Sequence, residues 1–347
     1  MSILEVKDLN FSYEGNKVLS DINFSLGQSE ILCILGPSGC GKTTLLQCIS
    51  GFEKISNGEI IYDGKVVSTI SNTTPPEKRK MALVFQDYAL FPHMNVKENI
   101  LFALRKKDTN EKKKICSEVL DLVGLKSKTE SFPHELSGGE QQRVAIARAI
   151  ATGCDLILFD EPFSNLDLGL RKKLRMELRS ILKKAKVSAI FITHDQNEAY
   201  DIADRIAILG NSKVEQIGTA FEIYQKPKNK FVANFLGSRN IIKAKYNKEE
   251  KAFECPLFSK QIDIDLKQDD DIYFYIPSDA IRTDSCELNG HQFSIGSKQF
   301  RGDHYHLKLV SKNTEINMSL PTSSYELIKE DRICLYFDLS KIILITD

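Results

Sequence analysis

The sequence shows no excess of charge of either sign, because 47 lysines and arginines balance 47 aspartates and glutamates. General nucleic-acid binders usually carry a basic excess, so we expect no nucleic-acid partner. Long apolar runs are also missing: residues 156–159 form one of the longest, and such runs are far too short to span a bilayer. A membrane role would therefore come through a partner. The first residues lack the basic start and apolar core of a signal peptide.

The eight cysteines form no C-x-x-C pair and no zinc-binding pattern. We therefore expect them to be reduced and mostly buried, as small apolar residues. Internal repeats and low-complexity segments are absent as well. The length of 347 residues suggests two or three domains. A hydrophobic content of 42% and a charged content of 27% are ordinary for a globular protein.

The first two thirds of the chain alternate apolar runs with helical patterns. Continuous apolar runs at 31–35, 156–159 and 189–192 are typical of strands buried on both faces. This alternation predicts an α/β layer domain with a mostly parallel sheet. Near the start, alternating segments predict two strands around a turn at Glu14-Gly15-Asn16. The predicted helices are 42–50, 112–123, 140–151 and 171–185.

The pattern changes after Gly237, where short strand-like runs separated by turn residues take over. This predicts a small all-β barrel or sandwich. We therefore predict two domains, at 1–237 and 238–347. The predicted strands of the second domain are 262–266, 272–276, 305–310, 333–337 and 342–345.

Residues 36–43 read GPSGCGKT and match the pattern G-x-x-x-x-G-K-S/T in full, after a buried strand and before a helix. In such a loop, glycines let backbone N–H groups point at phosphate oxygens, and the helix start adds its positive end. Lys42 is placed to reach the β- and γ-phosphates, and the Thr43 hydroxyl to ligate Mg²⁺. By itself the motif predicts a nucleoside triphosphate and nothing finer.

Cys40 lies inside this loop. One interpretation makes it a redox switch, because a helix N-terminus and Lys42 favour the thiolate. The other, which we favour, is a small residue that happens to be cysteine.

Two carboxylates, Asp160 and Glu161, follow the apolar run 156–159. Strand ends in such sheets open onto the crevice where ligands bind. Asp160 is therefore placed to hold Mg²⁺. Glu161 points another way along the extended chain and is placed to polarise the attacking water. The alternative is two solvated carboxylates in a turn before Pro162.

Residues 136–140, LSGGE, predict a helix start, because Ser137 and Glu140 have the spacing of a capping box. Capping does not explain two glycines in a first turn, where each costs about 1 kcal/mol relative to alanine. A second anion site, formed by exposed backbone N–H groups at the helix start, does explain these two glycines.

At this point the sequence resembles the ATP-binding cassette (ABC) family of transport ATPases, from residue 3 to about 240. The segment 136–140 is similar to the family's signature motif, with Glu140 where glutamine is the commonest residue. Gln86 is similar to the Q-loop, residues 164–167 to the D-loop, and His194 to the switch histidine. Tyr13 stands where the family stacks an aromatic ring on adenine. Taken alone, Tyr13 fits a strand-face aromatic, Gln86 a turn residue and His194 a satisfied strand-end histidine.

The resemblance implies a P-loop NTPase with a RecA-like core, an antiparallel β subdomain and a helical subdomain at about 88–152. It implies ATP and Mg²⁺ as cofactors. The catalytic residues it implies are Glu161, His194, Lys42 and Gln86. The implied metal ligands are Thr43, Gln86 and Asp160. The implied nucleotide-binding residues are Tyr13, Gly36, Pro37, Ser38, Gly39, Cys40, Gly41, Lys42, Thr43, Thr44, Ser137, Gly138, Gly139 and Asp167.

Family members work as head-to-tail pairs, so the resemblance implies that Ser137 and Gly139 of one copy cover the γ-phosphate held by a second copy. Asp167 would help to couple the two sites. Residues 86–94 resemble the segment with which importer ATPases receive their membrane permease subunits, although a short apolar loop of this kind also fits a protein core. A periplasmic or extracellular solute-binding protein would be an indirect partner. The implied location is peripheral, at the cytoplasmic face of the inner or plasma membrane.

The β-rich tail resembles the TOBE-type (OB-like) accessory domain of importer ATPases. Within that group, residues 160–167 and 74–79 are most similar to ferric-iron importers, which makes ferric iron the expected cargo, with polyamine, sulfate or sugar as alternatives. One departure is Asn211-Ser212, where the subfamily usually has a glycine-containing turn. The competing class is a soluble ABC ATPase acting on nucleic acid or ribosomes. A P-loop kinase or GTPase would not need the element at 137–139.

Overall fold

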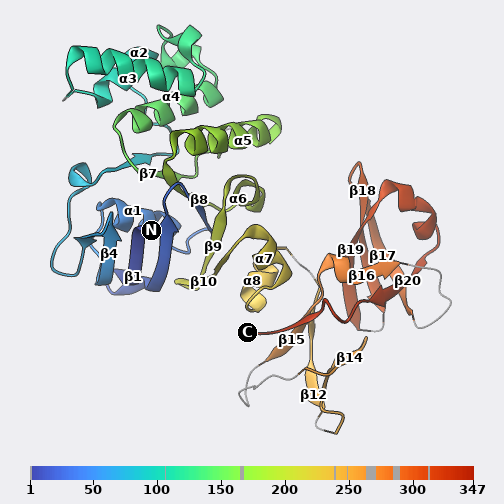
Figure 1. Ribbon diagram of the computed structural model, residues 1–347. Helices are drawn as coiled ribbons and strands as arrows, with labels where there is room; N and C mark the ends of the chain where they lie inside the picture. Colours follow the sequence, from blue (N-terminus) through green and yellow to red (C-terminus); the bar gives the residue numbers. More distant parts are fainter. Residues whose placement is uncertain are drawn as a thin grey trace. The chain divides into compact units, whose positions relative to one another are not determined.

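The computed structural model describes residues 2–105, 107–164, 168–237, 240–247, 249–262, 271–283, 290–311 and 313–347, with the side chains of 168–170 excepted. Contacts divide the chain into two compact units, Met1–Ala220 and Phe221–Asp347 (Figure 1). The helices α7 (Ala220–Gln225) and α8 (Lys230–Phe235) thus group mainly with the β-rich part. The boundary that we predict after Gly237 marks instead where strands take over from helices.

A six-stranded sheet in the order β10-β9-β3-β8-β7-β6 forms the centre of the first unit. Neighbouring strands from β6 to β9 pair in parallel, and only β10 pairs antiparallel. The predicted α/β layer with a mostly parallel sheet is thereby confirmed. The strands are β3 (Ile31–Leu35), β6 (Met81–Val84), β7 (Leu156–Asp160), β8 (Ser188–Thr193), β9 (Arg205–Gly210) and β10 (Lys213–Gly218).

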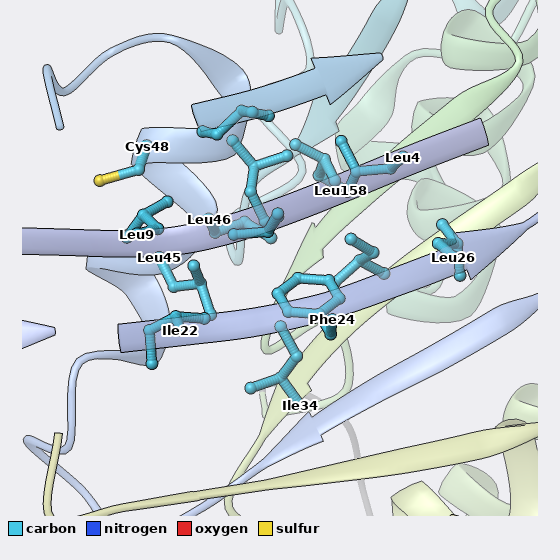
Figure 2. Close-up of a cluster of buried hydrophobic side chains, with 14 of the residues drawn as sticks. Leu4, Leu9, Ile22, Phe24, Leu26, Ile34, Leu45, Leu46, Cys48 and Leu158 are labelled. Atoms are coloured by element: carbon cyan, nitrogen blue, oxygen red, sulfur yellow. The ribbon is translucent and has the colours of Figure 1, made fainter. Parts of the chain in front are cut away.

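A smaller antiparallel sheet in the order β2-β1-β4-β5 packs onto the same unit. Its strands are β1 (Ser2–Tyr13), β2 (Asn16–Gly27), β4 (Asn57–Tyr62) and β5 (Lys65–Ser68). The helix α1 (Lys42–Ser50) contributes Leu45, Leu46 and Cys48 to the core beneath this sheet, next to residues of β1, β2, β3 and β7 (Figure 2). This packing fixes the helix that carries the glycine-rich loop.

The helices α2, α3 and α4 gather at one end of the first unit, beside α5 (Figure 1). All three lie within about 88–152, where the resemblance implies a helical subdomain. The sequence does not predict α2, a short helix with a complete capping box at Asn95. The helices are α2 (Val96–Ala103), α3 (Thr109–Leu122), α4 (Gly138–Ala151), α5 (Leu168–Ala185) and α6 (Gln196–Ile202).

The hairpin between β9 and β10 turns at Asn211 and Ser212, which have φ angles of 49° and 64°. Two-residue hairpins favour positive φ at both central positions, and asparagine tolerates that region better than most residues. The Ser212 carbonyl also accepts a hydrogen bond from the Ser20 amide at 2.8 Å. The turn therefore forms without the glycine that the subfamily usually has.

The second unit is built from three antiparallel sheets, in the orders β11-β15-β21, β12-β13-β14 and β16-β20-β17-β18-β19. Its core is separate and includes Phe274, Phe293 and Leu335. The predicted strand at 262–266 lies largely outside the described residues. The strands are β11 (Ile241–Lys243), β12 (Lys245–Asn247), β13 (Ala252–Glu254), β14 (Ser259–Lys260), β15 (Ile272–Tyr275), β16 (Ile281–Thr283), β17 (His291–Phe300), β18 (His304–Ser311), β19 (Thr314–Pro321), β20 (Arg332–Phe337) and β21 (Ile343–Thr346).

Six described cysteines are free thiols, four of them buried. Cys334 on β20 is disulfide-bonded, which corrects the expectation that every cysteine is reduced. None of the helices that the structure describes is long and apolar enough to cross a membrane.

Candidate functional site: a phosphate loop at the carboxyl edge of the sheet

The carboxyl ends of four neighbouring parallel strands bring the predicted site residues to one edge of the central sheet. The glycine-rich loop follows β3, His194 follows β8, Asp160 ends β7 and Gln86 lies two residues after β6. The register aligns these ends, since Leu35 pairs with Thr193, Ile192 with Asp160 and Phe159 with Val84. Ligands bind at this edge of parallel α/β sheets, so the topology assembles a site from distant segments.

Two glycines give the loop its shape. A side chain at Gly36 would place a Cβ only 2.3 Å from the carbonyl oxygen of Leu209, because β9 passes close by. Gly41 has φ 101°, which residues with a Cβ rarely adopt, and it precedes the first turn of α1. Because Gly41 has no side chain to cap the helix, the first amides of α1 remain available to an anion.

Lys42 is folded back onto the loop and is only 6% exposed. Its Nζ donates hydrogen bonds to the carbonyl oxygens of Gly36 and Pro37, both at 2.9 Å. These partners are neutral, so a phosphate oxygen that replaced them would pair the lysine charge with a negative charge. The lysine is thus held beside the loop that a triphosphate would occupy.

Cys40 is half-buried, and burial raises the pKa of its thiol more than the nearby Lys42 charge lowers it. A reactive thiolate needs the opposite balance. The structure therefore favours the interpretation of Cys40 as a small packing residue over that of a redox switch.

Asp160 is partly buried, and that burial raises the pKa of its carboxyl, with the negative charge of Glu161 adding to the effect and Lys42 opposing it. Two acids held close together at a strand end attract a cation. The donors at this edge that suit Mg²⁺ are the Asp160 carboxylate, the Thr43 hydroxyl and the Gln86 amide, and the last two are exposed. Mg²⁺ is usually bound by one or two carboxylates together with substrate phosphates and water, so this sparse oxygen set fits it.

Glu161 and His194 contact each other directly, with 3.2 Å between Oε1 and Nδ1. Glu161 has φ 43° and precedes Pro162, although a residue before proline prefers an extended backbone. Its amide donates to the carbonyl of Ile192 at 3.2 Å. The contact pairs the predicted base with the predicted γ-phosphate ligand.

The buried carboxyl group of Glu198 stabilises the turn around His194 through Thr193. Thr193 donates its hydroxyl to Glu198 at 2.5 Å, and the same hydroxyl oxygen accepts the Asp195 amide at 3.0 Å. Burial raises the pKa of Glu198. Sequence reasoning missed Glu198; the only signal for it was an acid four residues after the histidine.

Tyr13 ends β1 with 44% of its surface exposed, and its ring packs edge-on against Phe11 with centroids 4.6 Å apart. Its hydroxyl donates to Glu53, just beyond α1, at 3.2 Å. An exposed ring tied to the region of α1 has the placement expected of an adenine platform. The stacking of Tyr13 on a base stays a prediction.

The predicted capping box at the start of α4 is confirmed. The Ser137 amide donates to Glu140 Oε2 at 2.8 Å, and the Glu140 amide donates to Ser137 Oγ at 3.4 Å. Gly139 also has a packing reason: a Cβ there would lie 2.7 Å from Leu174 of α5. Whether this tip meets a nucleotide on a second copy stays a prediction, as does the role of Gly138. Asp167 lies outside the described residues.

Arg79, in the segment 74–79, is 5% exposed and anchors the other end of α1. Its guanidinium donates to the carbonyls of Cys48 and Ile49 at the helix C-terminus, and to Val67 and Ser68 on β5. Burial lowers its pKa to about 10, so it remains charged at pH 7. This part of the segment 74–79 therefore makes a scaffold contact.

Comparisons with known proteins agree with this geometry. The profile of the family described as ABC transporter matches residues 19–164. The spermidine/putrescine import ATP-binding protein PotA of Clostridium acetobutylicum is 42% identical over 321 residues, which cover 90% of this chain and 88% of that protein. Proteins of the same name from Clostridioides difficile (37% identical; 93% of this chain and 96% of that protein) and Borreliella afzelii (41% identical; 90% of each) are similar over comparable lengths.

The solved structure of cbiO1 from Clostridium perfringens, described as part of the ABC transporter complex cbiONQ, superimposes with a TM-score of 0.60 at 27% identity, covering 69% of this chain and 95% of that one. The expectation of ferric iron is corrected by the three sequence relatives, because all three are named for spermidine and putrescine import. The loop, the strand-end acids and these similarities lead to one conclusion: the chain belongs to the ABC transporter family, as an ATP-binding subunit with ATPase activity.

Proposed function

We propose that this chain is the ATPase subunit of an importer for spermidine, putrescine or a related polyamine. The cargo assignment rests on the relatives named for spermidine and putrescine import, which match about nine tenths of the chain at 37–42% identity. They also disfavour the alternative of an ATPase acting on nucleic acid or ribosomes. The nucleotide site itself is not expected to touch the solute.

In the proposed reaction, the loop amides and Lys42 hold the β- and γ-phosphates of ATP. Mg²⁺, held by Thr43, Asp160 and Gln86, would neutralise phosphate charge. Glu161 accepts a proton from the attacking water, and His194 donates a hydrogen bond to the γ-phosphate. The Glu161–His194 contact at 3.2 Å supports this division, because it holds both groups at one point of the sheet edge.

The complete transporter would contain two copies of this chain. The Ser137–Gly139 tip of each copy would cover the nucleotide of the other, and membrane permease subunits would dock near residues 86–94. A solute-binding protein would take part without touching this chain. The subunit would then be held at the cytoplasmic face of the membrane by its partners.

The cargo is tested by uptake of radiolabelled spermidine and putrescine in cells that lack this gene and carry either the wild type or Glu161→Gln. We expect uptake with the wild type only. Uptake of ferric iron or a sugar in its place, with no polyamine transport, would refute the cargo assignment.

The base is tested separately on the purified chain. Glu161→Gln should bind ATP, form a stable dimer on a sizing column with light scattering, and lose turnover by about 10²–10⁴-fold, the usual contribution of general base catalysis. Turnover at the wild-type rate would remove Glu161 from that role.

A further inference from the structure

The carbonyl oxygen of Pro162, one residue beyond Glu161, accepts two side-chain hydrogen bonds. Tyr88 donates its hydroxyl at 3.2 Å and Gln142 donates its Nε2 at 3.1 Å. Both donors are nearly inaccessible, at 4% and 2% exposure. A carbonyl has two acceptor lone pairs, so the two bonds satisfy it fully. Neither bond belongs to a helix or a sheet.

The turn that follows β7 needs such support. Glu161 has a positive φ of 43° in front of a proline, a conformation that persists only where the surroundings impose it. Proline has no N–H, so the backbone of Pro162 can be fixed by hydrogen bonds only through its carbonyl oxygen. On the far side, Phe163 is buried and stacks near Phe191 with centroids 6.4 Å apart.

The two donors come from different parts of the unit. Tyr88 lies in the segment 86–94, and both it and Ala89 have positive φ angles, of 61° and 44°. Gln142 lies on α4, which begins at the Ser137 tip. Arg148 of the same helix donates to the carbonyls of Tyr88 and Ala89 at 2.9 and 2.7 Å. Helix α4 therefore holds both the segment and the Glu161 turn.

The other end of the segment is fixed as well. Asn99 of α2 is fully buried, accepts the Phe91 amide at 2.9 Å and donates to the carbonyl of Met94 at 2.9 Å. A displacement of the segment would thus be resisted by α2 and α4 and transmitted through Tyr88 to Pro162. The ring of Tyr88 is buried at this contact, as the core interpretation of this segment predicts.

We propose that Tyr88 and Gln142 are positioning residues for ATP hydrolysis. Through the Pro162 carbonyl they hold the Glu161 carboxylate at its working position, and they make that position depend on the segment 86–94 and on α4. The proposal rests on the proposed role of Glu161 as the base. It adds two residues that touch neither nucleotide nor water, and it gives the segment a direct mechanical connection to the reaction.

Steady-state ATPase of the purified full-length chain tests the proposal with Tyr88→Phe, which removes only the hydroxyl. We expect kcat to fall about threefold to tenfold, the size of one lost hydrogen bond, with the KM for ATP unchanged. The matched control is Tyr62→Phe. Tyr62 is also buried and donates to a backbone carbonyl, that of Lys80, at 2.6 Å. The control should lower Tm by a similar amount and leave kcat at the wild-type value.

Gln142→Met supplies the second arm. With either donor removed, the carbonyl keeps one partner; with both removed, it is buried without any. The double variant should therefore lose more kcat than the product of the two single losses. If Tyr88→Phe and Tyr62→Phe lower Tm alike and both keep the wild-type kcat, or if Tyr88→Phe changes only KM, the proposal is wrong. Glu161→Gln, measured in parallel, separates the positioning role of Tyr88 and Gln142 from the role of Glu161 as the base. If Glu161→Gln turns over ATP at the wild-type rate, the base assignment itself is refuted.

Discussion

Helices α1 and α4 both begin at glycine-rich turns, yet their first turns are built in opposite ways. Gly41 leaves the start of α1 without a side-chain cap, and Lys42 brings a positive charge beside the loop. The start of α4 is closed by its own residues, because Ser137 and Glu140 satisfy each other's amides. One helix start is left open to an anion, and the other already holds a carboxylate.

This difference predicts two kinds of phosphate contact if both helix starts meet ATP. At α1, ATP meets unsatisfied amides and a lysine whose present partners are neutral carbonyls, so strong binding by one copy is expected there. At α4, a phosphate would meet a helix end that Glu140 already neutralises, and its negative charge would oppose the approach of ATP. Binding at the second tip should be weak and should depend on the closure of two copies.

The largest effect that this comparison predicts is on ATP binding at the open start of α1. Lys42→Ala should weaken ATP binding to the purified chain about 10- to 100-fold, because hydrogen bonds to charged groups contribute about 1.5–3 kcal/mol. Isothermal titration calorimetry with Lys113→Ala, an exposed lysine on α3, as the control measures it. Unchanged affinity would show that the α1 start is no more of an anion site than the α4 start.

The second effect tests the closed start as a packing element. Gly139→Ala should destabilise the chain by about 1–2 kcal/mol. The new methyl would meet Leu174 at 2.7 Å, and the usual cost of overpacking, about 1–3 kcal/mol, is partly offset by the roughly 1 kcal/mol that alanine gains over glycine in a helix. Gly124→Ala is the instructive comparison, because Gly124 has open space around it but a positive φ of 68°, so its cost is strain alone. Chemical denaturation measures both. A wild-type stability for Gly139→Ala would mean that α5 yields, and that packing does not explain this glycine.

The smallest effect concerns the charge at the closed start. Hydrogen bonds from Ser137 lower the pKa of Glu140 below its ordinary value of 4.5. A group with a depressed folded pKa stabilises the fold above its unfolded pKa, and this contribution disappears as pH falls through the folded pKa. Glu140→Gln should therefore lower Tm slightly at pH 7 and have no effect at strongly acidic pH. A difference in Tm that is constant with pH would assign the loss to packing.

The same variant also tests the opposition to phosphate. With the negative charge removed, ATP-driven dimerisation of an otherwise hydrolysis-dead chain should require less nucleotide. Light scattering at increasing ATP concentration measures it. If Glu140→Gln needs more ATP than the parent, the carboxylate assists closure and the contrast between the two helix starts fails.

Much of the first unit was predictable from sequence, because its strands are apolar runs with few alternatives. The segments 31–35 and 42–50 match β3 and α1 residue for residue. The site residues that follow such strands could also be placed, since parallel strands share one carboxyl edge. The positions of Asp160 and His194 required only that topology.

Other features depend on contacts between distant residues and leave little local signal. The bonds from Tyr88 and Gln142 to Pro162 span 74 and 20 residues. The burial of Arg79 depends on the approach of α1 and β5 to one point. In the second unit the strands β11 to β14 are two or three residues long, which is too short for an alternating pattern to be recognised. Whether such segments form strands depends on their pairing with neighbouring strands. Of the two segments on which the iron assignment rested, 74–79 makes a scaffold contact through Arg79 and is not expected to contact a solute.

Helix α1 carries a buried cation at each end, Lys42 at its start and Arg79 against its last carbonyls, and no acidic residue lies in its nine positions. Among the described residues, the hydrogen bonds of both cations are made to neutral oxygen acceptors and, for Lys42, to the sulfur of Cys40. The Asp160 carboxylate interacts with Lys42 and offsets part of its charge, and the remaining field adds to that of the α1 start at the sheet edge. A polyanion diffusing toward the loop is steered by it, so the association rate of ATP should fall as ionic strength rises.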